Sequence, residues 1–213
     1  MEIVFEDNDI LVINKEAGLS VQTKKLSEKS LETELKKYRK QKGEAAEIYI
    51  VHRLDQPVRG LMVVAKNKNA AAVLTRELTK DEFSKEYEAL LYKGKELSKE
   101  GSLRDYLIKD PKGNVSKAGK KGDAGAKEAL LDYAVLEETD KTYKVHVHLH
   151  TGRHHQIRVQ FANAGCPLLG DLKYGNSESL AYSNETGIKT VSLTACHLVF
   201  THPSTKKKME WNL

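Results

Sequence analysis

The sequence is poor in cysteine and contains no long apolar run. Neither of its two cysteines, Cys166 and Cys196, has a CxxC partner. We therefore expect a reducing, cytoplasmic compartment. No run of about 18 apolar residues occurs, so no segment is expected to span a membrane. The acidic start, MEIVFEDNDI, does not resemble a signal peptide.

Neither sign of charge dominates the sequence. Its 35 Lys and Arg against 30 Asp and Glu give a net charge of +5. This balance is compatible with a polyanionic partner but does not demonstrate one, and any RNA-binding surface must be a local face. Because neither an internal repeat nor a linker is visible, we expect residues 1–213 to form a single domain.

Apolar periodicity in the first half of the chain predicts short strands and two helices. The turn residues Asp7–Asp9 separate the first two strands, and Leu31, Leu35 and Tyr38 form a helical stripe. Asn67 can cap a second helix. The expected elements are two strands within residues 3–15, a helix over 31–38, strands over 48–54 and 60–66, and a helix over 67–78.

The second half alternates strand patterns with one helical pattern. The helix is expected to bury Ile157, Phe161 and Ala164 and to end at Gly165. The expected elements are a strand over 84–94, a hairpin of 129–138 with 141–150, a helix over 154–165, and a last strand over 191–203.

Residues 110–127 have no apolar period and are rich in Gly, Asp and Lys. This segment predicts either a solvated surface loop or a basic finger that closes on an RNA backbone. Its charge comes mostly from five lysines: Lys112, Lys117, Lys120, Lys121 and Lys127.

Asp55 is the first candidate for chemistry. It follows a β-rich run, lies in a turn between two predicted strands, and is flanked by His52 and Arg53. A carboxylate at a strand end beside cations is expected to be ionised and exposed in a cleft, as a nucleophile requires. On this segment alone, a turn-forming aspartate in a surface salt bridge is the commoner alternative.

A second polar cluster lies where a predicted strand turns into a helix. Backbone amides at a helix start, together with two guanidiniums, suit an anionic ligand. A polar, solvent-facing helix start is the alternative. The cluster consists of Arg153, His154, His155, Gln156 and Arg158.

Two long segments resemble the motifs of RluA-type pseudouridine synthases. HRLDQPVRGLMVVAK is similar to that family's HRLD-x-x-T/S-x-GLLLLAK motif, and TGRHHQIRVQFANAGCPLLGDLKYG to its TGRTHQIR…HxGxPIxGDxxYG motif. VFEDNDILVINKEAGL, SKEYEALLYKG and LVFTHPSTKKKMEW match in family order. Long motifs in order are a specific signal, and the resemblance extends from Val4 to Trp211.

The resemblance implies residue roles. Asp55 matches the essential aspartate, and Arg53 the arginine that helps occupy the place of the flipped base. Tyr87 matches the tyrosine that lies against the target base, and Arg158 the basic residue that pairs with the aspartate. Further RNA contacts are expected from Arg59, Arg153, His155, Lys117, Lys120 and Lys121.

The resemblance also implies an α/β (α+β) fold, with a mixed, largely antiparallel central sheet and flanking helices and loops around a central cleft. We expect no N-terminal S4 RNA-binding domain, so that target selection comes from the catalytic domain's own loops. The expected partner is ribosomal RNA, most readily that of the large subunit, or transfer RNA. We expect a monomer that needs neither a metal nor an organic cofactor.

The implied reaction isomerises uridine by breaking the N1–C1′ bond and forming a C5–C1′ bond. One carboxylate can serve in two ways: it traps C1′, as in retaining glycosidases, or it removes the C2′ proton to give a glycal. The base must leave its stack to be turned. Tyr87 offers stacking and a phenol for proton transfer at C5.

The sequence departs from the family motifs at a few positions. Val58 and Arg59 replace the usual Thr-Ser, which affects substrate preference more than chemistry, and Arg59 is expected to add a phosphate contact. Glu16 stands in place of a proline, His154 in place of a threonine, and Thr194 in place of a frequent histidine.

Three alternatives compete with this hypothesis. The alternating His146, His148 and His150 could ligate zinc, although a solvent-facing sheet side explains them as well. A non-catalytic RNA-binding protein would be expected to have lost Asp55, Tyr87 or Arg158. A hydrolase usually needs two carboxylates around the bond, and the motifs contain one suitable acid.

Overall fold

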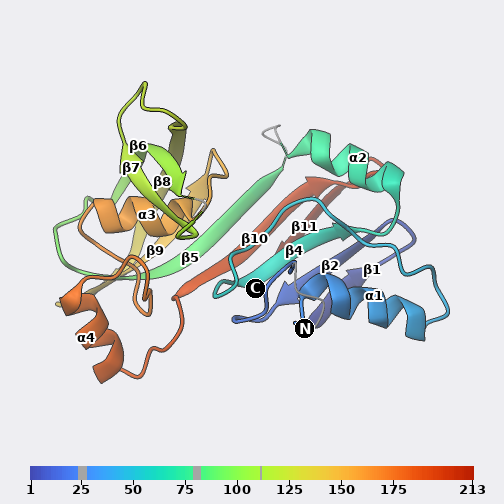
Figure 1. The fold of residues 1–213 in the computed structure, drawn as a ribbon, viewed down its shortest axis with the longest axis horizontal. Helices are drawn as coiled ribbons and strands as arrows, with labels where there is room; N and C mark the ends of the chain where they lie inside the picture. Colours follow the sequence, from blue (N-terminus) through green and yellow to red (C-terminus); the bar gives the residue numbers. More distant parts are fainter. Residues whose placement is uncertain (24–27, 79–82, 111) are drawn as a thin grey trace. The chain divides into compact units, whose positions relative to one another are not determined.

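The computed structural model describes residues 1–23, 28–78, 83–110 and 112–213 (Figure 1). The chain is polar between Gly18 and Ser30, and part of this stretch lies outside the described residues, as does one position of the 110–127 segment. The chain divides into two compact units. Unit one comprises residues 1–85 and 195–213, and unit two comprises residues 86–194. No helix within the described ranges is long and apolar enough to cross a membrane.

Unit one is built on antiparallel strands. Hydrogen bonds join them in the order β1-β2-β4-β10, with β3 also on β4 and β11 on β10. The predicted first hairpin is confirmed, because Asp7 Oδ1 accepts the backbone N–H groups of Asp9 and Ile10 and closes the turn. The strands are β1 (Glu2–Glu6), β2 (Ile10–Lys15), β3 (Tyr49–Ile50), β4 (Arg59–Ala65), β10 (Leu193–Thr201, with its first two residues in unit two) and β11 (Lys208–Asn212).

Two capped helices belong to unit one, α1 (Leu31–Gln41) and α2 (Lys68–Glu77). Asn67 caps α2 as predicted, since its side chain accepts the N–H of Ala70 at 2.9 Å. In α1, the stripe prediction is wrong at its third position. Arg39 is buried there and donates to backbone carbonyls, while Tyr38 is half-buried and donates its hydroxyl to Glu6.

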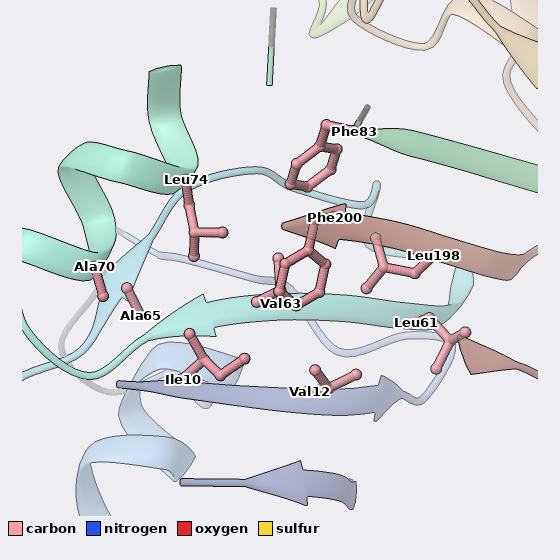
Figure 2. Packing of buried hydrophobic residues seen from close by; sticks show 10 residues of the cluster. All are labelled: Ile10, Val12, Leu61, Val63, Ala65, Ala70, Leu74, Phe83, Leu198 and Phe200. Carbon is pink, nitrogen blue, oxygen red and sulfur yellow. The ribbon is translucent and has the colours of Figure 1, made fainter. Parts of the chain in front are cut away.

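The core of unit one lies between β2, β4 and α2, as Figure 2 shows. Aliphatic side chains of the two strands face the helix, and aromatic rings close the cluster from β10 and from the residue before β5. Burying such side chains stabilises the unit by about 1.5–3 kcal/mol for each large one. The cluster consists of Ile10, Val12, Leu61, Val63, Ala65, Ala70, Leu74, Phe83, Leu198 and Phe200.

Unit two contains five antiparallel strands in the order β5-β9-β8-β6-β7. The predicted hairpin of β8 with β9 is confirmed, and its Val145 and Val147 are fully buried. The strands are β5 (Ser84–Tyr92, with its first two residues in unit one), β6 (Glu100–Asp110), β7 (Val115–Gly119), β8 (Lys127–Glu138) and β9 (Thr142–Leu149).

The helices of unit two are α3 (Gln156–Asn163) and α4 (Ser177–Glu185), of which only α3 was expected. Ile157 and Phe161 of α3 are buried and Gly165 ends it at φ +86°, as predicted, whereas Ala164 is only half-buried.

The prediction of an irregular segment over 110–127 is wrong in part, because β7 pairs with β6 as a hairpin. Asp110 Oδ1 accepts the N–H of Lys112, and Asn114 takes a positive φ, so the turn is built locally. The five residues of this edge strand, VSKAG, show no apolar alternation, which is why periodicity missed it.

The expected fold class is confirmed. The structure contains both helices and strands, and every strand pair whose register is known is antiparallel. The central cleft and the single domain stay predictions.

Candidate active site

Asp55 lies in unit one, in the loop that joins β3 to β4. It is half-buried between Leu54 and Val58, which are 6% and 2% exposed. Its backbone carbonyl accepts the N–H of Val58 at 3.0 Å, which closes a tight turn around the carboxylate. The apolar neighbours therefore anchor the loop in the unit while the acid remains partly accessible.

Lys15 anchors this loop through its backbone. The lysine side chain is fully buried, and its Nζ donates to the carbonyls of Glu16, Leu19 and Gln56 at 2.8, 2.8 and 3.2 Å. Burial lowers the pKa of Lys15 to about 8, against the opposing effect of the Asp55 charge. A buried ammonium thus faces the loop of the candidate nucleophile and holds the residue next to it.

Gln56 forms two further hydrogen bonds between the loop of Asp55 and the loop after β2. Its carbonyl accepts the N–H of Gly18, and its side-chain amide donates to the Gly18 carbonyl at 3.0 Å. The loop after β2 and the loop of Asp55 are therefore tied together through backbone groups, independently of side-chain identity in the first loop.

His52 does not act as a cation beside Asp55, so this part of the prediction is wrong. The imidazole is buried, and its Nε2 accepts the N–H of Val63 at 3.1 Å. Burial, followed by the charge of Lys85, lowers the pKa of His52 to about 3. The neutral ring is a structural element of the loop base and packs edge-on against Phe83.

The two arginines of the loop, Arg53 and Arg59, are exposed. Arg53 precedes Asp55 in the loop, and Arg59 begins β4. The structure thus places the three candidate residues of this motif within one loop and its exit, which suits the approach of a charged substrate from solvent.

Arg158 lies in unit two, in the first turn of α3, and is buried against Asp171. Its Nε and Nη2 donate to the two carboxylate oxygens of Asp171, both at 2.7 Å. Asp171 is fully buried, and the ring of Tyr174 lies 5.1 Å from the guanidinium carbon. This bidentate geometry fixes the plane of the guanidinium. The predicted pairing of Arg158 with Asp55 stays a prediction.

The start of α3 is organised by Thr151 and Gln156. Gln156 Oε1 accepts from the Thr151 hydroxyl and from the Arg153 N–H, at 2.8 and 2.9 Å, and its amide donates to the Leu130 carbonyl. Arg153 is exposed, and its Nε donates to the Glu128 carbonyl at 2.7 Å. These bonds place the arginine beside β8.

His155 precedes α3 in a left-handed conformation, with φ +55°. Burial and the charge of Arg158 lower its pKa to about 3, so the ring is neutral. Any RNA contact of His155 is therefore a neutral hydrogen bond and not an ion pair with a phosphate.

Tyr87 lies on β5, opposite Val147 of β9, and is 6% exposed. The predicted RNA-contacting lysines are exposed: Lys117 on β7, and Lys120 and Lys121 in the turn that follows. Their proposed roles stay predictions.

The three histidines of β9 and its end pair with carboxylates. His146 Nε2 lies 3.0 Å from Glu86, and His150 Nε2 lies 2.6 Å from Asp132. Among the described residues, the group with metal-compatible spacing is instead Asp7, Asp9 and His202. His202 Nδ1 accepts two backbone N–H groups and its Nε2 lies 2.7 Å from Asp7, so the ring is committed to that turn.

Sequence reasoning missed Lys15, Asp171 and Tyr174 as site residues. All three stand inside segments that resemble family motifs, so a signal was present. Their roles depend on partners that are not adjacent in the sequence, which short-range spacing does not reveal.

Comparisons with known proteins agree with the motifs. The family model described as RNA pseudouridylate synthase matches residues 9–163, which include Asp55, Tyr87 and Arg158. A ribosomal large subunit pseudouridine synthase C of Rickettsia bellii (strain RML369-C) is 34% identical over 182 residues, covering 85% of this chain and 59% of the relative. The chain thus spans less than two thirds of that relative.

Two further matches cover a larger share of the matched protein. A tRNA pseudouridine synthase C of Pasteurella multocida (strain Pm70) is 30% identical over 221 residues, 98% of this chain and 89% of the relative. The structure of human RNA pseudouridylate synthase domain containing 1 matches with a TM-score of 0.78 and 26% identity, over 100% of this chain and 82% of that one. The chain belongs to the RNA pseudouridylate synthase family.

Proposed function

We propose that this chain is an RNA pseudouridine synthase that isomerises specific uridines in ribosomal RNA, most readily of the large subunit, or in transfer RNA. The observation that carries the proposal is the Asp55 loop: a family-matched aspartate, half-buried between apolar anchors and fixed by the buried Lys15. The names of relatives that act on large-subunit and transfer RNA support the substrate class.

The chemistry assigns Asp55 to the ribose. Its ionised carboxylate either attacks C1′ or removes the C2′ proton, and both routes break the N1–C1′ bond. The freed uracil turns and forms the C5–C1′ bond, as the bond from C1′ to Asp55 breaks in the first route or as the proton returns to C2′ in the second. C5 then loses its proton and N1 gains one, with no net redox change. Tyr87 stacks on the base and serves proton transfer at C5. Arg158 keeps Asp55 ionised.

RNA binding uses the exposed cations. Arg53 fills the vacancy left by the flipped base. Arg59 and Arg153 contact phosphates, and His155 contributes a neutral hydrogen bond. The lysines come from β7 and the turn that follows it. We further propose that the chain acts as a monomer in the cytoplasm.

The experiment uses RNA transcribed with tritium at uridine C5, because the reaction replaces the C5–H bond and releases the label. Wild-type protein should release tritium from ribosomal or transfer RNA, and Asp55→Asn should abolish release. The matched control is Asp140→Asn, which makes the same change in an exposed turn and should leave the rate unchanged. Equal release by wild type and Asp55→Asn would refute the proposal.

The lysine contribution is tested by replacing Lys117, Lys120 and Lys121 together with alanine. If these lysines neutralise phosphates, log Kd for the RNA should depend less steeply on log salt, by up to about 0.7–0.9 for each phosphate that is no longer neutralised. An unchanged salt slope, measured by filter binding, would remove the hairpin from the RNA-binding surface.

A further inference from the structure

Tyr174 is half-buried and packs against a small core cluster of unit two beside α3. Its ring packs against Leu107 of β6, Ala129 of β8 and Val159 of α3. The turn that carries it is built on Asp171, whose Oδ1 accepts the N–H groups of Lys173 and Tyr174 at 3.0 and 3.3 Å. The backbone of the turn and the packing of the ring therefore fix the position of the phenol.

The face of this ring adjoins the guanidinium of Arg158, at 5.1 Å from its carbon to the ring centroid. The same turn supplies Asp171, which binds Arg158 through two hydrogen bonds of 2.7 Å. One short turn thus holds the arginine both by a carboxylate and by an aromatic face. The ring restrains the guanidinium plane without adding a second negative charge.

The hydroxyl of Tyr174 joins two further elements. It accepts the backbone N–H of Ser116 at 2.7 Å and lies 2.7 Å from Nδ1 of His155. Because the His155 ring is neutral, its Nδ1 can accept the phenolic proton, and this arrangement satisfies both contacts. Ser116 belongs to β7, the last strand in the order of unit two, and its N–H would otherwise face the open edge.

A second set of contacts also joins the hairpin of β6 and β7 to the start of α3 and to the turn that carries Tyr174. The Ser116 hydroxyl lies 2.9 Å from His154 Nδ1, and the His154 ring stacks on His155 with centroids 3.7 Å apart. Lys173 Nζ donates to the carbonyl of Asn114 in the hairpin turn at 2.9 Å. His154 stands where the family motif usually has threonine, so this chain has its own version of the connection.

We propose that Tyr174 is a positioning residue that orients Arg158 and couples it to the hairpin of β6 and β7. Lys117 lies on this hairpin, and Lys120 and Lys121 lie in the turn that follows it. When the hairpin binds an RNA backbone, the contact of Ser116 with the phenol therefore transmits the binding to Arg158. Tyr174 touches no reacting atom in this scheme. The inference rests on the proposed function, because it gives Tyr174 a part in the same reaction.

The test is Tyr174→Phe, which removes the hydroxyl and keeps the ring over Arg158. With tritium-labelled RNA as the probe, kcat should fall about tenfold, because the part-buried hydrogen bonds of the phenol to Ser116 and His155 are both lost. KM should change less than about twofold, since the lysines and arginines remain. The melting temperature should fall only by a few degrees.

The matched control is Tyr182→Phe, the same change on α4, which should leave kcat, KM and the melting temperature as in the wild type. A normal kcat in Tyr174→Phe would overturn the inference. So would parallel losses of kcat and active fraction, because these indicate a structural role alone. The failure of the proposed function is distinct: wild-type protein would then release no more tritium than Asp55→Asn.

Discussion

Mild acid should destabilise unit one through His52. The ring is buried, its Nε2 accepts the N–H of Val63, and its Nδ1 has no hydrogen-bond partner among the described residues. Burial and the charge of Lys85 lower its pKa from the usual 6.5 to about 3. A proton therefore binds more tightly to the unfolded chain than to the folded one.

The sign follows from this difference. Between pH 6.5 and about 3 the unfolded state binds more protons, so the free energy of unfolding rises with pH; above 6.5 this contribution is constant. The slope for one such group is about 1.4 kcal/mol per pH unit. Lowering the pH from about 6.5 to about 5 should thus cost about 2 kcal/mol from His52 alone, a large part of the stability of a small domain.

Urea unfolding at several pH values measures this slope. The single tryptophan of the chain, Trp211, lies in unit one with ring centroids 5.6 Å from Phe5 and 5.5 Å from Phe200, so its fluorescence reports on the unit that contains His52. The variant His52→Gln keeps an acceptor for the Val63 N–H but does not titrate. Subtracting its slope removes the contribution of other groups, including His155.

The wild type and His52→Gln should therefore differ by about 1.4 kcal/mol per pH unit between about pH 6.5 and about pH 5, and should run parallel above about pH 7. Identical slopes in the acid range would refute the reasoning, because they would mean that the folded protein protonates His52 as readily as the unfolded chain does.

Three further changes test the site. Lys15→Met should cost about 1–3 kcal/mol in urea unfolding, because three part-buried backbone carbonyls lose their donor, and should lower tritium release more than tenfold; unchanged release would contradict a role for Lys15 in holding the Asp55 loop. Gly60→Ala should lower the melting temperature far more than Gly43→Ala. Both glycines have a positive φ, but a Cβ on Gly60 would lie 2.3 Å from the Ala195 carbonyl oxygen, whereas Gly43 faces open space; equal melting temperatures would contradict this. Asp171→Asn should cost about 3–5 kcal/mol by urea unfolding, because it removes the carboxylate charge from a buried, bidentate ion pair; a loss under about 1 kcal/mol would show that the pair contributes little.

Local signals predicted the elements that depend on local contacts. The turn at Asp7 and the cap at Asn67 are each closed by side-chain oxygens that bind N–H groups two or three residues later. The strand pattern over residues 141–150 predicted β9 for the same reason, since the period of a strand is independent of its partners. Such features are legible in a single sequence.

Features that depend on distant partners were not predicted. β7 exists because β6 offers a pairing edge, and Ser116 has its N–H satisfied by a tyrosine 58 positions away. His52 was taken for a cation because Arg53 follows it, but burial against Phe83 makes it neutral. In both cases the outcome is decided by what surrounds the side chain after folding.

Variants of the polar residues at the start of α3 need to be measured for both stability and activity. Gln156, Arg158 and Gln160 are 3%, 3% and 0% exposed, so this helix buries polar side chains where an amphipathic pattern would expose them. Each is used structurally: Gln156 binds β8, Arg158 binds Asp171, and Gln160 donates to the Leu103 carbonyl at 3.0 Å. A loss of activity in any variant of this motif therefore combines unfolding with chemistry. The variants that best assign Arg158 to catalysis are those that lose little unfolding free energy. Tyr174→Phe is expected to lose only a few degrees of melting temperature, so the phenol of Tyr174 is the more selective place to probe the arginine.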